Sequence, residues 1–174
     1  MRILFIGDIV GRPGRQLVKI GLGALASRHD IDLVIVGPRH YRAEDAVSAA
    51  ASVSERVHFT GYVSDRQLAA CYRCSTVFVF PSLYEGFGLP AIEAMSHGVP
   101  IACSNAGSLP EVCSEAALLF DPLSTEAITT AVDSLLRDSA LRDRLSAAGR
   151  ARANEFSWTA TADQTVRVYE KVRA

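Results

Sequence analysis

The chain has 174 residues, of which 49% are hydrophobic, and a formal net charge of −1. This length suits one domain with its own core, which we expect to span residues 1–174. The near-zero charge gives no electrostatic reason to expect a nucleic acid or an anionic membrane as partner. We find neither an apolar run long enough to span a membrane nor a signal peptide, and therefore expect a cytoplasmic protein.

Strands and helices are predicted to alternate along the first half of the chain. Short runs rich in Val, Ile, Leu and Phe predict buried strands, and each run is bounded by Gly, Pro or polar residues. Strands are expected at residues 2–6, 33–36 and 57–60, and helices at residues 15–27 and 43–53. A further helix should begin after Ser64, because Ser64 and Gln67 have the spacing of a capping box, and should end near Cys74.

The alternation continues in the second half and then gives way to helices alone. Strands are expected at residues 77–80, 100–103 and 117–120, and helices at residues 90–97, 110–114, 125–137, 140–155 and 159–172. This spacing predicts a parallel sheet covered on both faces, with right-handed crossovers. We therefore predict a single α/β, Rossmann-like, doubly wound domain with six strands in the order 3-2-1-4-5-6 and a helical C-terminal segment. A ligand crevice should lie where the loops after the first and fourth strands meet.

The loop after the fourth strand carries the residues best suited to binding. Gly86 and Gly88 let a ligand approach the backbone, and Pro90 suits the first turn of a helix whose free N–H groups attract an anion. Glu85 and Glu93 flank the loop, and a carboxylate accepts hydrogen bonds from sugar hydroxyls. This pattern favours a phosphate-linked sugar. The residues alone leave a second interpretation open, in which Glu93 only favours the helix dipole and Glu85 is a solvated loop residue.

Residues 33–174 also resemble a known family. The segments that carry the resemblance are Gly61, Pro81-Ser82, Glu85-Gly86-Phe87-Gly88-Leu89-Pro90, Glu93-Ala94, Pro100-Ile101-Ala102, Gly107-Ser108-Leu109-Pro110-Glu111-Val112, Asp121-Pro122 and Phe156-Ser157-Trp158. Together they closely resemble the donor-nucleotide-binding half of the retaining GT-B glycosyltransferases of family 4.

The resemblance implies a role for each loop residue. Glu85 would be the catalytic residue beside the donor sugar, and Glu93 would hold the ribose. Backbone near Tyr62 would lie close to the base. The amides that would face the diphosphate are those of Gly86, Phe87, Gly88 and Leu89. No metal and no further cofactor is implied, because the nucleoside-diphosphate sugar is itself the donor substrate.

The resemblance also implies a missing half. A complete GT-B enzyme has an N-terminal acceptor domain, for which 174 residues leave no room. The chain is therefore expected to bind the donor without being active alone. The alternative is a recombined or engineered folded module with weak or no nucleotide binding. The sequence assigns neither the base nor the sugar nor the acceptor.

The first loop departs from the family 4 pattern. Those enzymes resemble one another here in a Gly-Arg run followed by Lys-Gly, which neutralises the diphosphate. This chain has Asp8 and Pro13 at the basic positions, which leaves Arg12 as the nearby cation. Residues 1–36 resemble instead the start of a bacterial calcineurin-like metallophosphoesterase family, in which the aspartate of the Gly-Asp turn binds metal. A lone Asp8 cannot hold a dinuclear centre, so this function is the least favoured. The mixed resemblance indicates a chimera with a seam near residues 36–37.

The cysteines and the last helix complete the expectations. Cys71 and Cys74 lie one helical turn apart, while Cys103 and Cys113 are too far apart, and on different elements, to complete a zinc site. We therefore expect no metal or redox chemistry.

In the final helix an apolar stripe must be buried on something. The stripe consists of Val166, Tyr169 and Val172. We expect it to pack as ordinary core, and any part left exposed would be a candidate for self-association. In the GT-B family that the chain resembles, the final helix crosses to the partner domain.

Overall fold

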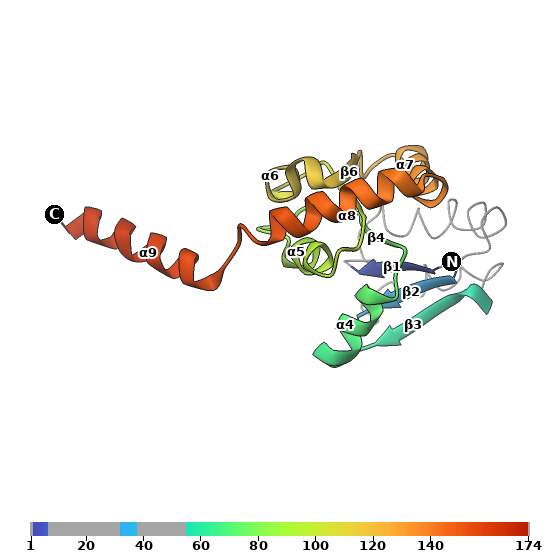
Figure 1. Ribbon diagram of the computed structural model, residues 1–174, viewed down its shortest axis with the longest axis horizontal. Helices are drawn as coiled ribbons and strands as arrows, with labels where there is room; N and C mark the ends of the chain where they lie inside the picture. Colours follow the sequence, from blue (N-terminus) through green and yellow to red (C-terminus); the bar gives the residue numbers. More distant parts are fainter. Residues whose placement is uncertain (1, 7–31, 38–54, 174) are drawn as a thin grey trace.

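The computed structural model describes residues 2–6, 32–37 and 55–173 (Figure 1). Their strands form one parallel sheet in the order β3-β2-β1-β4-β5-β6. The strands are β1 (Arg2–Ile6), β2 (Asp32–Val36), β3 (Val57–Gly61), β4 (Val77–Phe80), β5 (Ile101–Ser104) and β6 (Ala117–Phe120). The α/β class with a parallel sheet is confirmed. The order changes direction at β1 and β4, which pair with each other.

Helices lie between the strands along the chain and continue after the last strand. They are α4 (Asp65–Arg73), α5 (Leu89–Ser96), α6 (Leu109–Cys113), α7 (Thr125–Arg137), α8 (Ser139–Ala153) and α9 (Trp158–Arg173), with a 3₁₀ turn η3 (Ser114–Ala116) after α6. The helices expected at residues 15–27 and 43–53 lie outside the described residues, as does the first loop with Arg12.

The sheet has a core on each face because its central strands are buried on both sides. Val77 and Val79 of β4 belong to a cluster with α7 and the start of α8. Phe78 and Phe80 belong to a second cluster with α4, α5 and α6. Alternating side chains of one strand point to opposite faces, so an all-apolar run such as Val77–Phe80 supplies both cores.

Helix α8 joins the two cores. Its Leu145 is buried in the first cluster, while Ala153 is buried in the second. Between them Gly149 lies against Met95 of α5, where an added Cβ would come within 3.2 Å of the Met95 Cγ. A small residue at this position lets α5 and α8 pack closely. The end of α8 is thereby brought next to the helix that follows the glycine-rich loop.

Helix α9 leaves the body of the molecule, and in Figure 1 it extends away to the left. None of its residues is buried. Its exposed apolar side chains are Trp158, Val166, Val168, Tyr169 and Val172. The expectation that the stripe packs as ordinary core is therefore wrong. Neither of the two core clusters takes a residue from α9, and their described helical residues come from α4 to α8 and the η3 turn.

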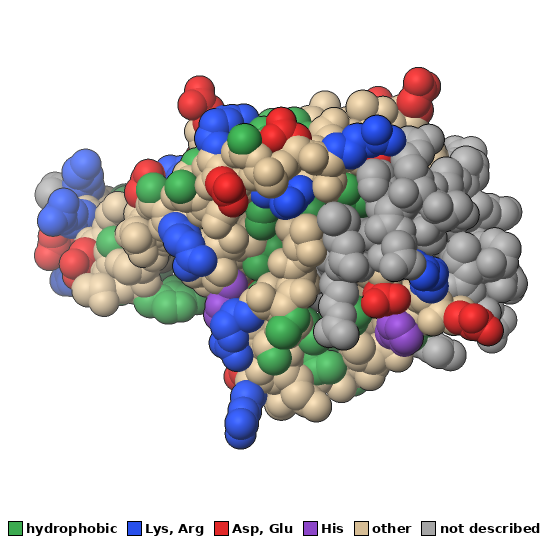
Figure 2. All heavy atoms as spheres, turned by 45° about the vertical axis from the view of Figure 1, so that its right-hand side comes forward, with side chains coloured by type: hydrophobic (Ala, Val, Ile, Leu, Met, Phe, Trp, Pro, Cys, Tyr) green, Lys and Arg blue, Asp and Glu red, His purple; other side chains and the backbone are tan. Residues whose placement is uncertain are grey.

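Charged side chains of both signs are mixed on the described surface that Figure 2 shows. Within the described ranges, no helix combines the length and the apolar character that crossing a membrane requires.

Candidate functional site

The loop between β4 and α5 lies at the carboxyl edge of the sheet. Its last residue, Gly88, has a φ of 98°, a left-handed conformation that favours glycine. An added Cβ at Gly88 would lie 2.7 Å from the Leu109 Cδ2, so the site also lacks space for a side chain. No side chain caps the start of α5, and Pro90 lies in its first turn. Pro90 has no N–H, and the Ala91 N–H donates to the Gly88 carbonyl oxygen at 2.9 Å. Of the first turn of α5, the Leu89 N–H has no acceptor among the described residues and is left available to an anion.

Glu93 of α5 is exposed at its carboxylate end and is held by a buried tyrosine. The Tyr72 hydroxyl of α4 lies 3.2 Å from Glu93 Oε2 and donates to it, with the Pro90 carbonyl oxygen at 3.4 Å. Burial, together with the negative charge of Glu93, raises the pKa of Tyr72 well above its usual range. The tyrosine therefore stays protonated and keeps donating. This hydrogen bond orients the carboxylate toward the surface with acceptor capacity to spare.

Glu85 is half-buried, and it is the backbone of Glu85 that is anchored. The Ser108 hydroxyl, at the start of α6, lies 3.0 Å from the Glu85 carbonyl oxygen and 2.9 Å from that of Phe87. The Gly107 backbone lies directly behind Glu85, since an added Cβ there would be 3.1 Å from the Glu85 nitrogen and oxygen. The start of α6 therefore fixes the backbone of the glycine-rich loop in position.

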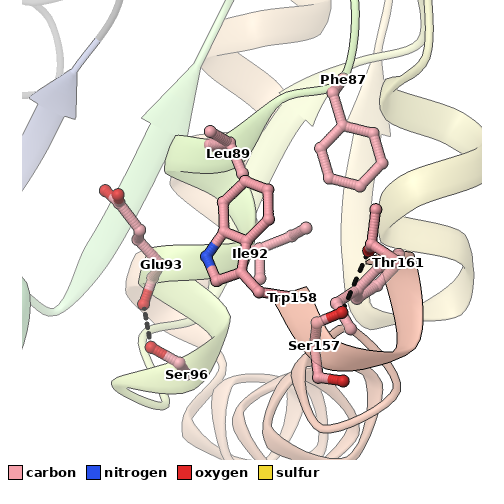
Figure 3. Close-up of a pocket in the computed structure, with 9 residues that line it drawn as sticks. Phe87, Leu89, Ile92, Glu93, Ser96, Ser157, Trp158 and Thr161 are labelled. Atoms are coloured by element: carbon pink, nitrogen blue, oxygen red, sulfur yellow. Dashed lines mark hydrogen bonds between the residues drawn. The ribbon is translucent and has the colours of Figure 1, made fainter. Parts of the chain in front are cut away.

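A pocket of about 270 Å³ opens between the loop, α5 and the start of α9 (Figure 3). Its wall is mainly apolar, and Glu93 and Ser96 contribute polar atoms along the exposed side of α5. The lining residues are Phe87, Leu89, Ile92, Glu93, Ser96, Phe156, Ser157, Trp158 and Thr161. In Figure 3 the indole of Trp158 lies beside Leu89 and Ile92, with its nitrogen on the side of Glu93.

The structure brings together some of the predicted site residues and not others. Phe87, Leu89 and Glu93 line the pocket, whereas Glu85 does not. Gly86 is exposed, and an added Cβ there would meet nothing within 4 Å. Tyr62 is 84% exposed and follows β3, three strands from β4 in the sheet order. Arg12 lies outside the described residues.

Comparison with known proteins assigns the chain to a family. The model of the family described as "Glycosyl transferases group 1" matches residues 2–152. The chain belongs to the group 1 glycosyl transferases. Because the match begins at residue 2, it gives no support to a seam near residues 36–37, or to a metallophosphoesterase start.

Individual relatives of this group 1 glycosyl transferase domain are longer proteins. O-antigen chain mannosyltransferase B of Escherichia coli is 45% identical over 114 residues, covering 66% of this chain and 30% of that protein. MMP alpha-(1->4)-mannosyltransferase of Mycolicibacterium hassiacum is 45% identical over 130 residues, covering 72% and 32%. The structure of sucrose-phosphate synthase from Thermosynechococcus elongatus has a TM-score of 0.78 and 31% sequence identity. The match covers 98% of this chain and 45% of that chain. The chain therefore spans less than half the length of these relatives.

Two residues of this candidate site were not predicted from the sequence. A role for Tyr72 could have been suspected from its spacing, because it lies four residues after Leu68 and so on the same face of the amphipathic helix α4. A tyrosine buried there needs a hydrogen-bond partner for its hydroxyl. Nothing in the sequence identifies Glu93 as that partner. Ser108 belongs to a segment that resembles the family, but its contact with the loop has no local sequence signal.

The two buried cysteines correct another expectation. Cys103 of β5 and Cys113 of α6 lie on different elements, as predicted, but their Sγ atoms are 3.6 Å apart. The thiol of Cys103 donates to Cys113, which lowers the pKa of Cys113 and raises that of Cys103. Sequence separation was a poor guide here, because β5 and α6 are consecutive elements that pack against each other. Among the residues that the structure describes, no group of three or more potential ligands could hold a metal.

Proposed function

We propose that this chain, as one domain over residues 1–174, is the donor-binding half of a retaining glycosyltransferase. The donor is a nucleoside-diphosphate sugar. It binds with its diphosphate at the start of α5, its ribose on Glu93 and its base toward the segment that contains Tyr62. The order of the sheet supports this placement, because ligands of open parallel sheets bind at the carboxyl edge where the strand order reverses.

The observation that carries the proposal is the pairing of Glu93 with Tyr72. A carboxylate that only favoured the helix dipole would need no buried donor to orient it. Here a nearly inaccessible hydroxyl, 3.2 Å away, fixes one oxygen, while the other stays exposed beside the uncapped start of α5. Two vicinal ribose hydroxyls are a fitting partner for such a group, and the phosphates fit the amides of the glycine-rich loop up to Leu89, which donate to no described acceptor.

Glu85 is assigned to the donor sugar. Its backbone is anchored by Ser108, which gives the side chain a defined starting point, and no described side chain pairs with its carboxylate. A hexose of the mannose type is favoured, since several relatives are named mannosyltransferases. Transfer needs an acceptor-binding half, and the chain alone is expected to bind the donor without transferring its sugar.

Calorimetric titration tests the proposal. UDP, GDP, ADP and their hexose conjugates are titrated into the chain, and at least one nucleotide should bind at a single site. Glu93→Ala should weaken that binding by about 1–3 kcal/mol through loss of ribose hydrogen bonds. Glu170→Ala removes an exposed carboxylate of α9 and is the matched control. Equal affinity of Glu93→Ala and the control would contradict the ribose assignment.

A weaker binding module is the second candidate, favoured by the first loop. Asp8 and Pro13 replace the two basic residues of the family pattern, and each charge-assisted contact to phosphate is worth roughly 1.5–3 kcal/mol. Changing Asp8→Arg together with Pro13→Lys should then tighten nucleoside diphosphate binding and make it more sensitive to salt. Nucleoside without phosphate should gain little. Equal gains for both ligands would show that the first loop does not face the diphosphate.

The exposed stripe of α9 is proposed to be covered by the acceptor half in a complete enzyme. In the isolated chain it is available for self-association, because a contiguous apolar patch is commonly an interface. Sedimentation across a range of concentrations should show reversible association, and Tyr169→Glu should abolish it. A monomer at every concentration would contradict the self-association.

A further inference from the structure

The glycine-rich loop is held firmly from one side by the start of α6. Ser108 approaches two of its carbonyl oxygens, but one hydroxyl has one proton and donates to only one acceptor at a time. On the other side Gly86 is exposed with open space around it, and Phe87 is 45% exposed. The backbone contacts with α6 leave this outer side of the loop without a polar anchor.

An aromatic contact supplies the second anchor. The ring of Phe156, which follows α8, meets the ring of Phe87 edge to face, with centroids 5.7 Å apart and planes at 84°. This geometry is favourable for two aromatic rings and is worth more than their apolar contact alone. Phe156 is half-buried, so its ring is partly packed and partly free.

Arg152 of α8 fixes Phe156 in turn. Its Nε donates to the Val112 carbonyl oxygen and its Nη2 to that of Glu111, both at 2.9 Å. Its Nη1 pairs with the carboxylate of Glu155. The guanidinium carbon lies 4.7 Å from the centroid of the Phe156 ring. A planar group with five donors can make all these contacts at once, whereas a lysine ammonium cannot.

We propose that Arg152 and Phe156 are positioning residues for the glycine-rich loop. Arg152 ties the end of α8 to the end of α6, and Phe156 packs against the Phe87 side chain, a contact separate from the Ser108 hydrogen bonds to the loop backbone. The loop amides are thereby held in place before a ligand arrives. This inference rests on the proposed function in one respect, namely that these amides receive the diphosphate. It also gives Phe156 a role beyond lining the pocket.

Backbone ¹⁵N relaxation in the ligand-free chain tests the positioning directly, because the amides of residues 86–89 donate no described hydrogen bond that hydrogen exchange could report on. Phe156→Leu and Arg152→Lys should each lower the order parameters of residues 86–89, from the values of rigid backbone toward those of flexible backbone. Amides of α7, which packs in the other core, should be unchanged. Phe156→Tyr keeps the ring and should restore the wild-type order parameters. Arg150→Lys is the matched control, because Arg150 lies on the same helix and donates to the His97 carbonyl oxygen instead.

Affinity gives a second readout that simple loss of stability would not produce. Phe156→Leu should weaken binding of whichever of UDP, GDP and ADP binds the wild-type chain by about two- to tenfold, the range expected from one aromatic contact. Binding of the matching nucleoside should stay unchanged, because it lacks the phosphates that the loop would hold. Unchanged order parameters at residues 86–89, or an equal fall there and in α7, would overturn the proposal. If the wild type bound none of the three nucleotides, the proposed function would fail while the relaxation data still decided the positioning role.

Discussion

The helices that the structure describes begin in two different ways. α4, α7, α8 and α9 each have a side-chain oxygen that accepts a hydrogen bond from the N–H three residues further on. These oxygens belong to Ser64, Ser124, Asp138 and Ser157. α5 begins at Gly88 without a side-chain cap, and the hydroxyl of Ser108, at the start of α6, contacts loop carbonyls instead of capping its own helix.

This difference distinguishes helix starts that a side-chain cap stabilises from a helix start that is suited to binding a ligand. A side-chain cap stabilises a helix by about 1 kcal/mol, and α5 forgoes it. At the same position the Leu89 N–H donates to no described acceptor, and it lies at the edge of the sheet near Glu93. The contrast therefore indicates which helix start is kept for a ligand, and each of the following variants tests it.

The largest effect is expected at Gly88. Gly88→Ala forces a side chain into a left-handed conformation and places its Cβ 2.7 Å from the Leu109 Cδ2, so it should destabilise the fold by about 1–3 kcal/mol. Gly86→Ala is the control, because an added Cβ there meets nothing within 4 Å. It should change stability by less than about 0.5 kcal/mol. Urea unfolding measures both, and similar losses in the two variants would refute the difference.

Removing one hydroxyl from each kind of helix start should affect different properties, namely stability in one variant and mainly nucleotide affinity in the other. Ser124→Ala removes a true cap, so it should lower stability by about 1 kcal/mol without changing nucleotide affinity. Ser108→Ala should lower stability less and weaken nucleotide binding several-fold, because it releases the loop. Thermal unfolding and calorimetry on the same samples compare them. A loss of nucleotide affinity in Ser124→Ala would contradict the distinction between capped and uncapped helix starts.

The smallest effect concerns Tyr72, whose pKa is raised by burial and by the charge of Glu93. Above pH 10 the tyrosine ionises in the unfolded chain but stays protonated in the folded protein. The folded state then binds more protons, so stability falls as pH rises, by about 0.8 kcal/mol from this group at pH 10.5. Tyr72→Phe should remove that part of the slope. Tyr169→Phe, at an exposed tyrosine of α9, should keep it, and denaturant unfolding between pH 8 and about pH 10.5 distinguishes them.

The parts of the fold that could be predicted have local causes. Val77–Phe80 is apolar at every position, so it had to be a strand buried on both faces. The capping box at Ser64 and Gln67 is present with both of its hydrogen bonds. Glycine and proline likewise located the loop before α5. In each case the deciding interaction spans only a few residues of sequence.

The parts that could not be predicted depend on long-range packing. Tyr72 and Glu93 meet because α4 and α5 share one face of the sheet, and no residue type encodes that pairing. Phe87 meets Phe156 because α8 crosses from one core to the other. The exposed position of α9 was missed for the same reason. An amphipathic pattern shows that a helix has an apolar face but does not show which surface covers it.

That exposure has a consequence for cooperativity. Most helical stability in proteins comes from tertiary packing, and an isolated helix of this length is marginal in water. α9 has 16 residues and buries none of them. Beyond its first turn, which lines the pocket, its helix–coil equilibrium is therefore set mainly by its own sequence. The chain should therefore not melt as one unit: far-UV ellipticity from α9 should fall gradually at temperatures where the sheet and its two cores remain intact. Covering α9 would convert this local transition into part of the global one, so that docking and helix formation would be a single event.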